Sequence, residues 1–335
     1  MSFRKHRKQN LLTGILNSFR EDGWRVLILN DIKYHPFILR ISKNEESFTV
    51  RIYIWNLTHG GGAARPADEY RIQVTGVDRF IDQPDGRTLI LGYWEDENVY
   101  AGFDFNMHNG ILGASPSIQI RDNALRLASI NGYAPHKREN DEIAIAFRPD
   151  FFGEYVRSLN QLHSFGQSDR DYEILEKVAQ DPNQVNDQEI EYVAVERKTV
   201  VYNVRKKLRD NSFKRRIQVA YSCKCAFCGI QLKLIDAAHI IPVEAEGNDA
   251  TNNGIALCAL HHRAYDKNLV TFTDNYEIVL NTETIEILVQ NGFGAGLDVF
   301  KQTLNGRIHL PSNVDDRPLV QNVLRANEIR GWNFS

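Results

Sequence analysis

Apolar residues alternate with polar ones, or form short β-branched runs, over most of the first 160 positions of the chain. Segments of this kind are typical of strands in a sheet with a buried face. Turn-forming stretches such as Gln83-Pro84-Asp85-Gly86 and Asn109-Gly110 separate them. We therefore predict an α+β domain, mainly β or barrel-like, with strands at residues 24–29, 37–41, 48–55, 70–77, 88–93 and 143–147.

Helical patterns frame these strands. The basic, amphipathic N-terminus predicts a first helix, and the segment PDFFGEYVRSLNQLHSF predicts a closing one. Residues 165–196 are polar and acidic with few aromatics, which indicates a linker with one or two short helices. We accordingly expect a first domain at residues 1–164, a linker at 165–196 and a second domain at 197–335.

The second domain is predicted to begin with a basic helix and to continue into a cysteine-rich region. The segment LVTFTDNYEIVL then predicts two strands with a turn at Asp274-Asn275, and PLVQNVLRANEIRGW predicts a final helix. We expect this C-terminal tail to pack on the cysteine-rich region, and we assign it no chemistry.

The bulk composition is that of a soluble globular protein with room for two domains, at 335 residues with 42% hydrophobic and 25% charged side chains. No apolar run approaches the ~20 residues that a membrane span requires. The N-terminus lacks a small-residue cleavage site, so we expect a cytoplasmic protein whose four cysteines stay reduced. Clustered reduced cysteines favour metal binding over disulfides.

The net charge of −3 conceals a strongly basic stretch. Between Arg197 and Arg216 there are nine Lys or Arg residues and one acid, Asp210, which makes +8 over twenty residues. Such a block can neutralise several phosphates of double-stranded DNA, although a solvated helix face is the ordinary alternative. The side chains expected to contact DNA are Arg205, Lys206, Lys207, Arg209, Lys214, Arg215 and Arg216.

Two short knuckles supply four metal-ligand side chains. Cys225 and Cys228 form a C-x2-C pair, and Cys258 and His261 form a C-x2-H pair downstream. Three thiolates and an imidazole suit a closed tetrahedral site for a structural Zn²⁺ ion. The alternative is a group of buried free cysteines, and Cys223 is expected to serve packing rather than ligation.

Three further polar residues lie between and after the knuckles. His239 ends an apolar strand that Pro242 stops, and Asn253 lies in a loop five residues before Cys258. His262 directly follows His261, so on a helix its side chain points to a different side. It can therefore serve a second metal ion without joining the first site.

This order of residues resembles the HNH endonucleases, which have the ββα-metal fold. The segments DAAHIIP and NNGIALCALHHRAYD are similar to the branch found in bacterial restriction endonucleases, including modification-dependent ones. The resemblance covers about sixty residues, or about a hundred and twenty if the tail belongs to it. It implies that His239 is a general base for phosphodiester hydrolysis, that Asn253 holds the strand of His239, and that His262 binds a catalytic Mg²⁺ or Mn²⁺ ion.

The chain departs from the commonest pattern of that family at one position. Many members have Asp or His directly before the general base as a metal ligand, whereas this chain has Ala238. Another side chain must then complete the catalytic metal site. Asp266 is the first candidate because it follows His262 at i, i+4 on the same helix face, and Asp236 is the alternative.

The first domain is expected to choose the target of the nuclease. Its segment RIYIWNLTHGGGAARPADEYRIQ combines strand aromatics with a glycine-rich loop, and Arg65 and Arg71 are candidate DNA contacts. Tyr53 and Trp55 are candidates to stack on an extruded base. The alternative is that these aromatics are ordinary core residues and the loop an ordinary turn.

We therefore expect a restriction-type, metal-dependent DNA endonuclease that recognises its site, or a modified base, through the first domain. Such an enzyme needs a companion DNA methyltransferase or a target modification that its host lacks. Because double-strand cleavage requires two active sites, we also expect a homodimer. The alternatives are a zinc-stabilised DNA-binding protein with an inactive HNH module and a mobile-element or repair nuclease.

Overall fold

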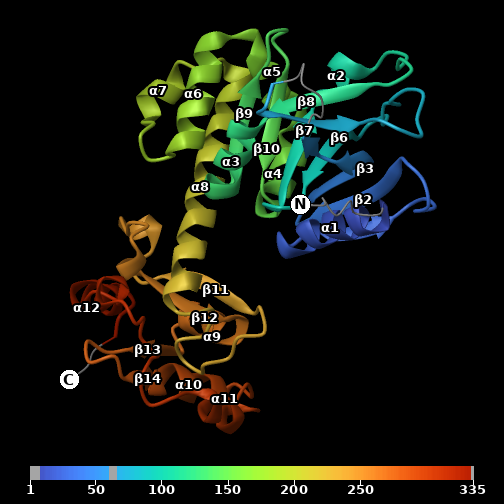
Figure 1. Cartoon of the computed structure of the whole chain (residues 1–335). Coiled ribbons are helices and arrows are strands. Elements are labelled where there is room, and N and C mark those ends of the chain that lie inside the picture. The colour runs from blue at the N-terminus through green and yellow to red at the C-terminus, as the bar shows by residue number, and fades with distance from the viewer. Residues whose placement is uncertain (1–7, 60–65, 333–335) are drawn as a thin grey trace. The chain divides into compact units, whose positions relative to one another are not determined.

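The computed structural model describes residues 8–59 and 66–332 of the chain, which form two compact units, Met1–Arg209 and Asp210–Ser335 (Figure 1). The glycine-rich loop at residues 60–62 and Arg65, our candidate for a DNA contact, lie outside the described residues. None of the helices in the described ranges is long and apolar enough to cross a bilayer.

A seven-stranded sheet organises unit 1, in the order β1-β2-β3-β6-β7-β10-β9. Neighbouring strands are antiparallel except for β3 and β6, which are parallel. The strands are β1 (Arg25–Ile28), β2 (Phe37–Lys43), β3 (Glu46–Asn56), β6 (Arg87–Trp94), β7 (Val99–Phe103), β9 (Tyr133–Lys137) and β10 (Ile143–Phe147). A smaller sheet holds β4 (Thr58–His59), β5 (Glu69–Gln73) and β8 (Ser117–Arg121).

Helices make up the rest of unit 1. They are α1 (Lys8–Glu21), α2 (Phe105–His108), α3 (Asp122–Asn131), α4 (Phe152–Arg157), α5 (Leu159–Ser164), α6 (Asp169–Gln180) and α7 (Asp187–Glu191), with 3-10 turns η1 (Pro149–Phe151) and η2 (Phe165–Gln167). The long helix α8 (Val195–Ala220) begins in unit 1 and ends in unit 2.

The central strands of the large sheet are buried on both faces, which explains their apolar sequences. On β10, Ile143, Ile145 and Phe147 join a core with α1, α4, α6 and α8, whereas Ala144 and Ala146 join a second core with β5, β8 and α3. Successive side chains of a strand point to opposite faces, so both sets must be apolar. This is why β10 is apolar throughout instead of alternating with polar residues.

The predicted first helix and the six predicted strands are confirmed. The structure adds β7, β8, β9 and α3, which we did not predict. Small residues such as Ala101 and Gly102 in β7, and Pro135 in β9, weaken the local strand signal. The expected closing helix is divided into η1, α4 and α5 instead of being continuous.

The structure divides the chain differently from our expectation of a linker at residues 165–196. That segment forms α6 and α7, and its apolar residues Leu175, Val178 and Ile190 lie in the core of unit 1. The buried Asp171 accepts a hydrogen bond from Arg197 at 2.8 Å, which ties the start of α8 to the same unit. The boundary between the two compact units lies within α8, between residues 209 and 210.

Unit 2 is built on a β-hairpin followed by a helix. Strands β11 (Ile235–His239) and β12 (Gly254–Cys258) pair antiparallel, and α9 (Ala259–Asp266) follows at once. The pair β13 (Val270–Phe272) and β14 (Ile278–Leu280) comes next, as predicted. The other elements are η3 (Val243–Ala245), η4 (Thr251–Asn253), α10 (Thr282–Gln290), α11 (Leu297–Thr303), η5 (Val314–Asp316) and α12 (Val320–Ile329).

The C-terminal end of α8 packs closely on this hairpin. Phe213 and Ile217 belong to the core of unit 2, and a Cβ atom at Gly254 would lie 2.2 Å from the Cδ1 atom of Ile217. Only glycine permits so close an approach of helix and strand. The predicted tail also enters this core through Ile308, Val323 and Ala326.

Candidate functional site

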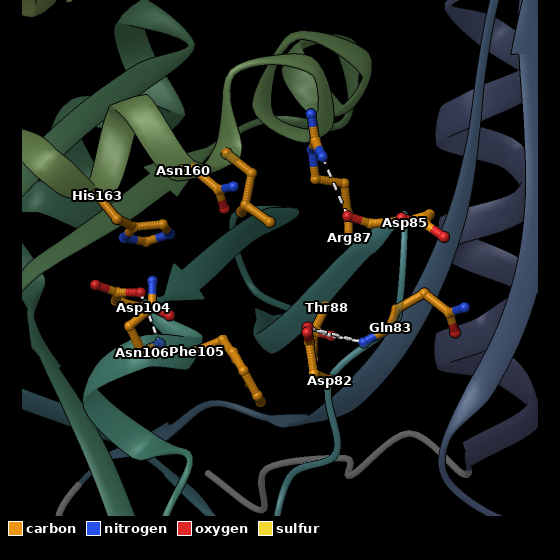
Figure 2. A pocket seen from close by; sticks show the side chains of 12 residues that line it. Asp82, Gln83, Asp85, Arg87, Thr88, Asp104, Phe105, Asn106, Asn160 and His163 are labelled. Atoms are coloured by element: carbon orange, nitrogen blue, oxygen red, sulfur yellow. Dashed lines mark hydrogen bonds between the residues drawn. The ribbon is translucent and has the colours of Figure 1, made fainter.

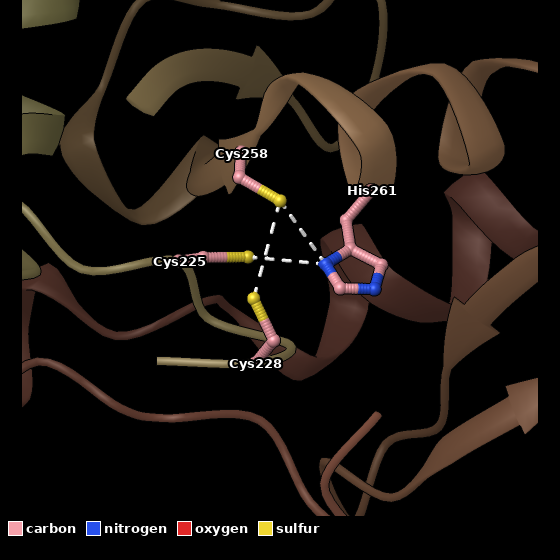
Figure 3. Close-up of side chains that lie close together, drawn as sticks. All are labelled: Cys225, Cys228, Cys258 and His261. Atoms are coloured by element: carbon pink, nitrogen blue, oxygen red, sulfur yellow. Dashed lines mark hydrogen bonds between the residues drawn. The ribbon is translucent and has the colours of Figure 1, made fainter. Parts of the chain in front are cut away.

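Four side chains from two segments that are distant in sequence converge in unit 2 (Figure 3). Cys225 and Cys228 lie in the turn before β11, Cys258 caps the start of α9, and His261 is in the first turn of that helix. The Sγ atoms of Cys258 and Cys225 lie 3.2 and 3.5 Å from Nδ1 of His261, and those of Cys228 and Cys258 are 3.9 Å apart. The four ligand atoms all lie within 4.8 Å of one another.

These separations fit a tetrahedral zinc ion. Zn–S bonds of about 2.3 Å and Zn–N bonds of about 2.0–2.1 Å place ligand atoms about 3.5–3.8 Å apart. Burial raises the pKa of Cys258 and raises that of Cys228 to about 12. Burial acts in the same direction on Cys225, but the neighbouring His261 side chain and hydrogen bonds with the backbone lower its pKa to about 6. A cation among the sulfurs would offset the raised pKa values of Cys228 and Cys258 and favour their thiolate forms.

The imidazole of His261 is oriented for ligation through Nδ1. Its Nε2 atom lies 3.0 Å from Oγ1 of Thr303, and that hydroxyl donates to the carbonyl of Phe300 at 2.6 Å. Because the Thr303 hydroxyl donates its proton to Phe300, it accepts a hydrogen bond from Nε2–H of His261. The lone pair of Nδ1 is then directed at the cysteines. Thr303 lies in the tail, to which we had assigned no chemistry.

His239 is held at the end of β11 by two neighbours. Its Nε2 atom lies 3.0 Å from Oδ1 of Asp249. Its ring stacks on Phe213 of α8 with centroids 3.9 Å apart and an interplanar angle of 2°. The side chain is 23% exposed, so this oriented imidazole remains accessible to a substrate.

Asn253 is buried and joins two parts of the backbone near His239. Its Oδ1 atom accepts from the amide of Ile241 at 3.0 Å, and its Nδ2 atom donates to the carbonyls of Ile241 and Asn248 at 3.1 and 2.8 Å. Its own carbonyl accepts from the amide of Ile240 at 2.8 Å. Asn253 therefore ties the loop at Asn248 to the backbone that follows His239.

His262 lies on α9 between two carboxylates. Its Nδ1 atom is 3.8 Å from Oδ2 of Asp236 on β11, and its Nε2 atom is 3.6 Å from Oδ2 of Asp266. The structure thus brings both of our candidate ligands beside His262, at opposite nitrogens of the ring. Asp236 also lies 3.5 Å from Nζ of Lys214.

Unit 2 is therefore a ββα module with a Cys3His cluster and two accessible histidines. Residues 225–273 match the model of a family described as HNH endonuclease. These residues form an HNH endonuclease domain, and the chain is a nuclease. The resemblance noted in the sequence is thus confirmed at the level of this domain.

A second family model, described as Methylase-associated X1, matches residues 48–156 of unit 1. A solved structure titled "Modification dependent TagI restriction endonuclease" aligns with 82% of this chain and 80% of its own at 12% identity. The TM-score is 0.29, which does not establish a common fold. No curated protein matches the chain significantly.

Several side chains of the basic helix are engaged within unit 1. Arg205 donates to the carbonyl of Val185 at 2.8 Å and pairs with Asp187. Lys207 pairs with Asp22 at 2.6 Å. Both residues therefore stabilise the packing of α8 on its own unit, whatever they contribute to DNA binding.

The part of α8 in unit 2 is more exposed. Lys214 pairs with Asp236, and Arg216 donates to the Ser212 hydroxyl at 2.6 Å and to the Asp249 carbonyl. The remaining members of the predicted set are the exposed Lys206 and Arg215 and the half-buried Arg209.

The aromatics of the first domain lie in its interior. Tyr53 is 1% exposed and Trp55 7%, and both rings contact Phe80. They are therefore core residues, as in the alternative interpretation of the sequence. Arg71 is half-buried on β5, opposite Thr58 of β4 and Gln119 of β8.

The surface of unit 1 has several hollows, of which two are lined mainly by polar residues. One of about 270 Å³ is bordered by Asp82 and Asp85 on one side and by Asp104 and His163 on the other (Figure 2). Both nitrogens of His163 are bonded, to the Tyr155 hydroxyl at 3.0 Å and the Ile143 carbonyl at 2.6 Å. The second hollow, of about 580 Å³, is lined by residues that include Arg121 of β8, Lys137 of β9 and Arg138, which follows β9. Each of these three cations is paired with an acid.

Sequence reasoning missed Asp249, Phe213 and Thr303. Asp249 lies in a polar loop and Phe213 in a basic helix, so neither carries a local signal of its role. A weak signal was present in the spacing of Phe213 and Ile217, which at i, i+4 form one apolar helix face.

Proposed function

We propose that this chain is a restriction-type DNA endonuclease that hydrolyses phosphodiester bonds with a histidine base and a divalent metal ion. The observation that carries the proposal is the placement of His239 and His262, both accessible, in the HNH domain beside the Cys3His cluster. A zinc ion at the cluster would join the turn before β11 to α9. It would thereby fix the frame in which the two histidines are held.

In the proposed reaction, His239 takes a proton from the attacking water. Asn253 holds the backbone that directly follows the base, and Phe213 limits rotation of the imidazole. His262, with Asp236 or Asp266, would hold Mg²⁺ or Mn²⁺. When bound, that ion supplies positive charge to stabilise the scissile phosphate and the leaving oxygen.

The second ligand of the catalytic ion can be assigned by comparing Asp236→Asn with Asp266→Asn. Nε2 of His262 and Asp266 would hold an ion on one side of the ring, and Nδ1 and Asp236 would hold one on the other. Only one variant is therefore expected to weaken Mn²⁺ binding strongly, by about 10-fold or more. Calorimetric titration of each variant with Mn²⁺, after saturation of the zinc site, measures this effect without relying on activity. Equal, unchanged affinity in both variants would argue against either aspartate.

We propose that the exposed face of α8 contacts the DNA backbone. Arg215→Ala should reduce the slope of log affinity against log salt by about 1, because one phosphate contact and its released counterion are lost. Arg325→Ala, which removes an exposed arginine of α12 in the same unit, serves as the control and should leave the slope unchanged. Fluorescence anisotropy with one duplex at several salt concentrations measures both slopes. An unchanged slope for Arg215→Ala would remove this residue from the interface.

Target choice is proposed to reside in unit 1, whose match is to a methylase-associated domain. Purified protein with Mg²⁺ or Mn²⁺ should produce discrete fragments from matched phage or plasmid DNAs. Cutting of only the cytosine- or adenine-modified DNA would indicate a modification-dependent enzyme. Cutting of unmodified DNA would indicate an enzyme that needs a protective methyltransferase.

We further propose that the active form is a homodimer, since cutting both strands requires two active sites. Sedimentation of the chain with its DNA tests the stoichiometry.

If the wild-type protein binds DNA and cuts none of these substrates with either ion, it is instead a zinc-stabilised binding protein.

A further inference from the structure

The carboxylate of Asp249 contacts the proposed base, His239. No motif recognised in the sequence includes Asp249. Its Oδ1 atom lies 3.0 Å from Nε2 of His239, and both side chains are largely shielded, at 21% and 23% exposed. A carboxylate accepts hydrogen bonds and donates none when ionised. The hydrogen on this bond therefore belongs to Nε2 of the imidazole.

The other nitrogen of His239 is correspondingly free. Within residues 8–59 and 66–332, Nδ1 has no hydrogen-bond partner. With Nε2 protonated, the neutral imidazole carries its lone pair on Nδ1. The partly exposed ring therefore has one basic atom, Nδ1, and the hydrogen bond to Asp249 determines that this atom is Nδ1 and not Nε2.

Asp249 is itself fixed by its neighbours on both sides. The carbonyl of Asn248 accepts from Nδ2 of Asn253 at 2.8 Å, and the Asn248 side chain accepts from the amide of Ala250 at 3.0 Å. The backbone carbonyl of Asp249 accepts from Arg216 of α8. The same helix provides Phe213, which stacks on the other partner of the pair, His239. Asn253 and α8 therefore hold the carboxylate and the imidazole in one frame.

We propose that Asp249 is a positioning residue, which fixes His239 in the Nε2–H tautomer and makes Nδ1 the atom that accepts the proton of the attacking water. The inference rests on the proposed function of His239. In this step Nδ1 takes the proton as the water oxygen bonds to phosphorus and the bond to the leaving oxygen breaks. The imidazolium that results has Asp249 as its counter-ion, so the new charge is stabilised where it forms.

Asp249→Ala is expected to lower kcat for DNA cleavage by about 10²-fold, the lower end of the usual contribution of a general base, with KM and DNA affinity unchanged. Added formate should restore part of this activity, because it can occupy the vacated position of the carboxylate. Asp274→Ala, which removes an exposed acid from the turn between β13 and β14, is the matched control and should behave as wild type with or without formate. Zinc content and thermal unfolding of each variant establish that the fold is intact.

Nitrogen-15 NMR of the histidine side chains gives a readout that is independent of cutting. The signals of His239, identified by their loss in His239→Ala, should show a proton on Nε2 in the wild type and exchange between the two tautomers in Asp249→Ala. A proton on Nδ1 in the wild type, or wild-type kcat in Asp249→Ala, overturns the inference. Wild-type cutting by His239→Ala would instead overturn the proposed base, and the NMR result would still report on Asp249.

Discussion

Replacing His239 by alanine is expected to lower the rate of DNA cleavage by about 10³-fold, since a positioned general base contributes 10²–10⁴-fold. The side chain ends β11 and is 23% exposed, and its ring lies on Phe213 rather than in the centre of the core. Its removal should therefore leave DNA affinity, zinc content and thermal unfolding close to those of the wild type. Single-turnover cleavage with saturating Mg²⁺ or Mn²⁺ measures the chemical step.

His309→Ala is the matched control for this experiment, because His309 is an exposed histidine of the same unit. Its cleavage rate should equal that of the wild type. A His239→Ala variant that still cut at the wild-type rate would falsify the role of His239 as base. A variant that lost DNA binding together with cutting would show that the residue acts on the interface instead.

Replacing Cys225 by serine is expected to abolish stoichiometric zinc binding and to unfold unit 2 while unit 1 stays folded. Structural zinc sites contribute apparent binding free energies of about 10–16 kcal/mol, which are also folding free energies. Cys225 is fully buried, and it lies in the turn that precedes β11. Loss of the ion would release the turn before β11 from the start of α9, and cleavage should be lost with it.

Metal analysis by mass spectrometry and calorimetric unfolding measure these effects. Cys223→Ser provides a close control, because Cys223 lies two residues earlier, is exposed and is outside the cluster. It should retain zinc and both unfolding transitions. Full zinc occupancy in Cys225→Ser would show that the ion does not need this sulfur and would refute the closed four-ligand site.

The fold was predictable where local patterns are strong. The six predicted strands and the helices at both ends of the chain carry clear apolar periodicity, and the structure contains them. The segment at residues 165–196 was harder, because its polar composition hides a few core residues such as Leu175 and Ile190. A short amphipathic helix on the surface of a core has the composition of a linker, and only its packing distinguishes the two.

The candidate site residues were also predictable, because their spacing along the chain is short and local. Metal ligands that bind from one turn must be two or three residues apart, so each of the two candidate ligand pairs lies within a few consecutive positions. That the two pairs converge on one point was an inference from the presence of two such pairs in one chain. In the structure the four side chains do lie together. The separation of His261 from His262 likewise follows from helix geometry alone.

The chain's sequence by itself therefore determined the class of fold, the two metal-ligand knuckles and the histidines of the HNH domain, because these depend on residue types at short spacings. The tertiary structure alone decided the partners of those residues: Asp249 beside His239, Thr303 beside His261, and Asp236 and Asp266 at opposite nitrogens of His262. It also decided that Tyr53 and Trp55 lie in the core. Hydrogen bonds and burial depend on how distant segments pack, and a local pattern does not encode which loop of the chain meets which side chain.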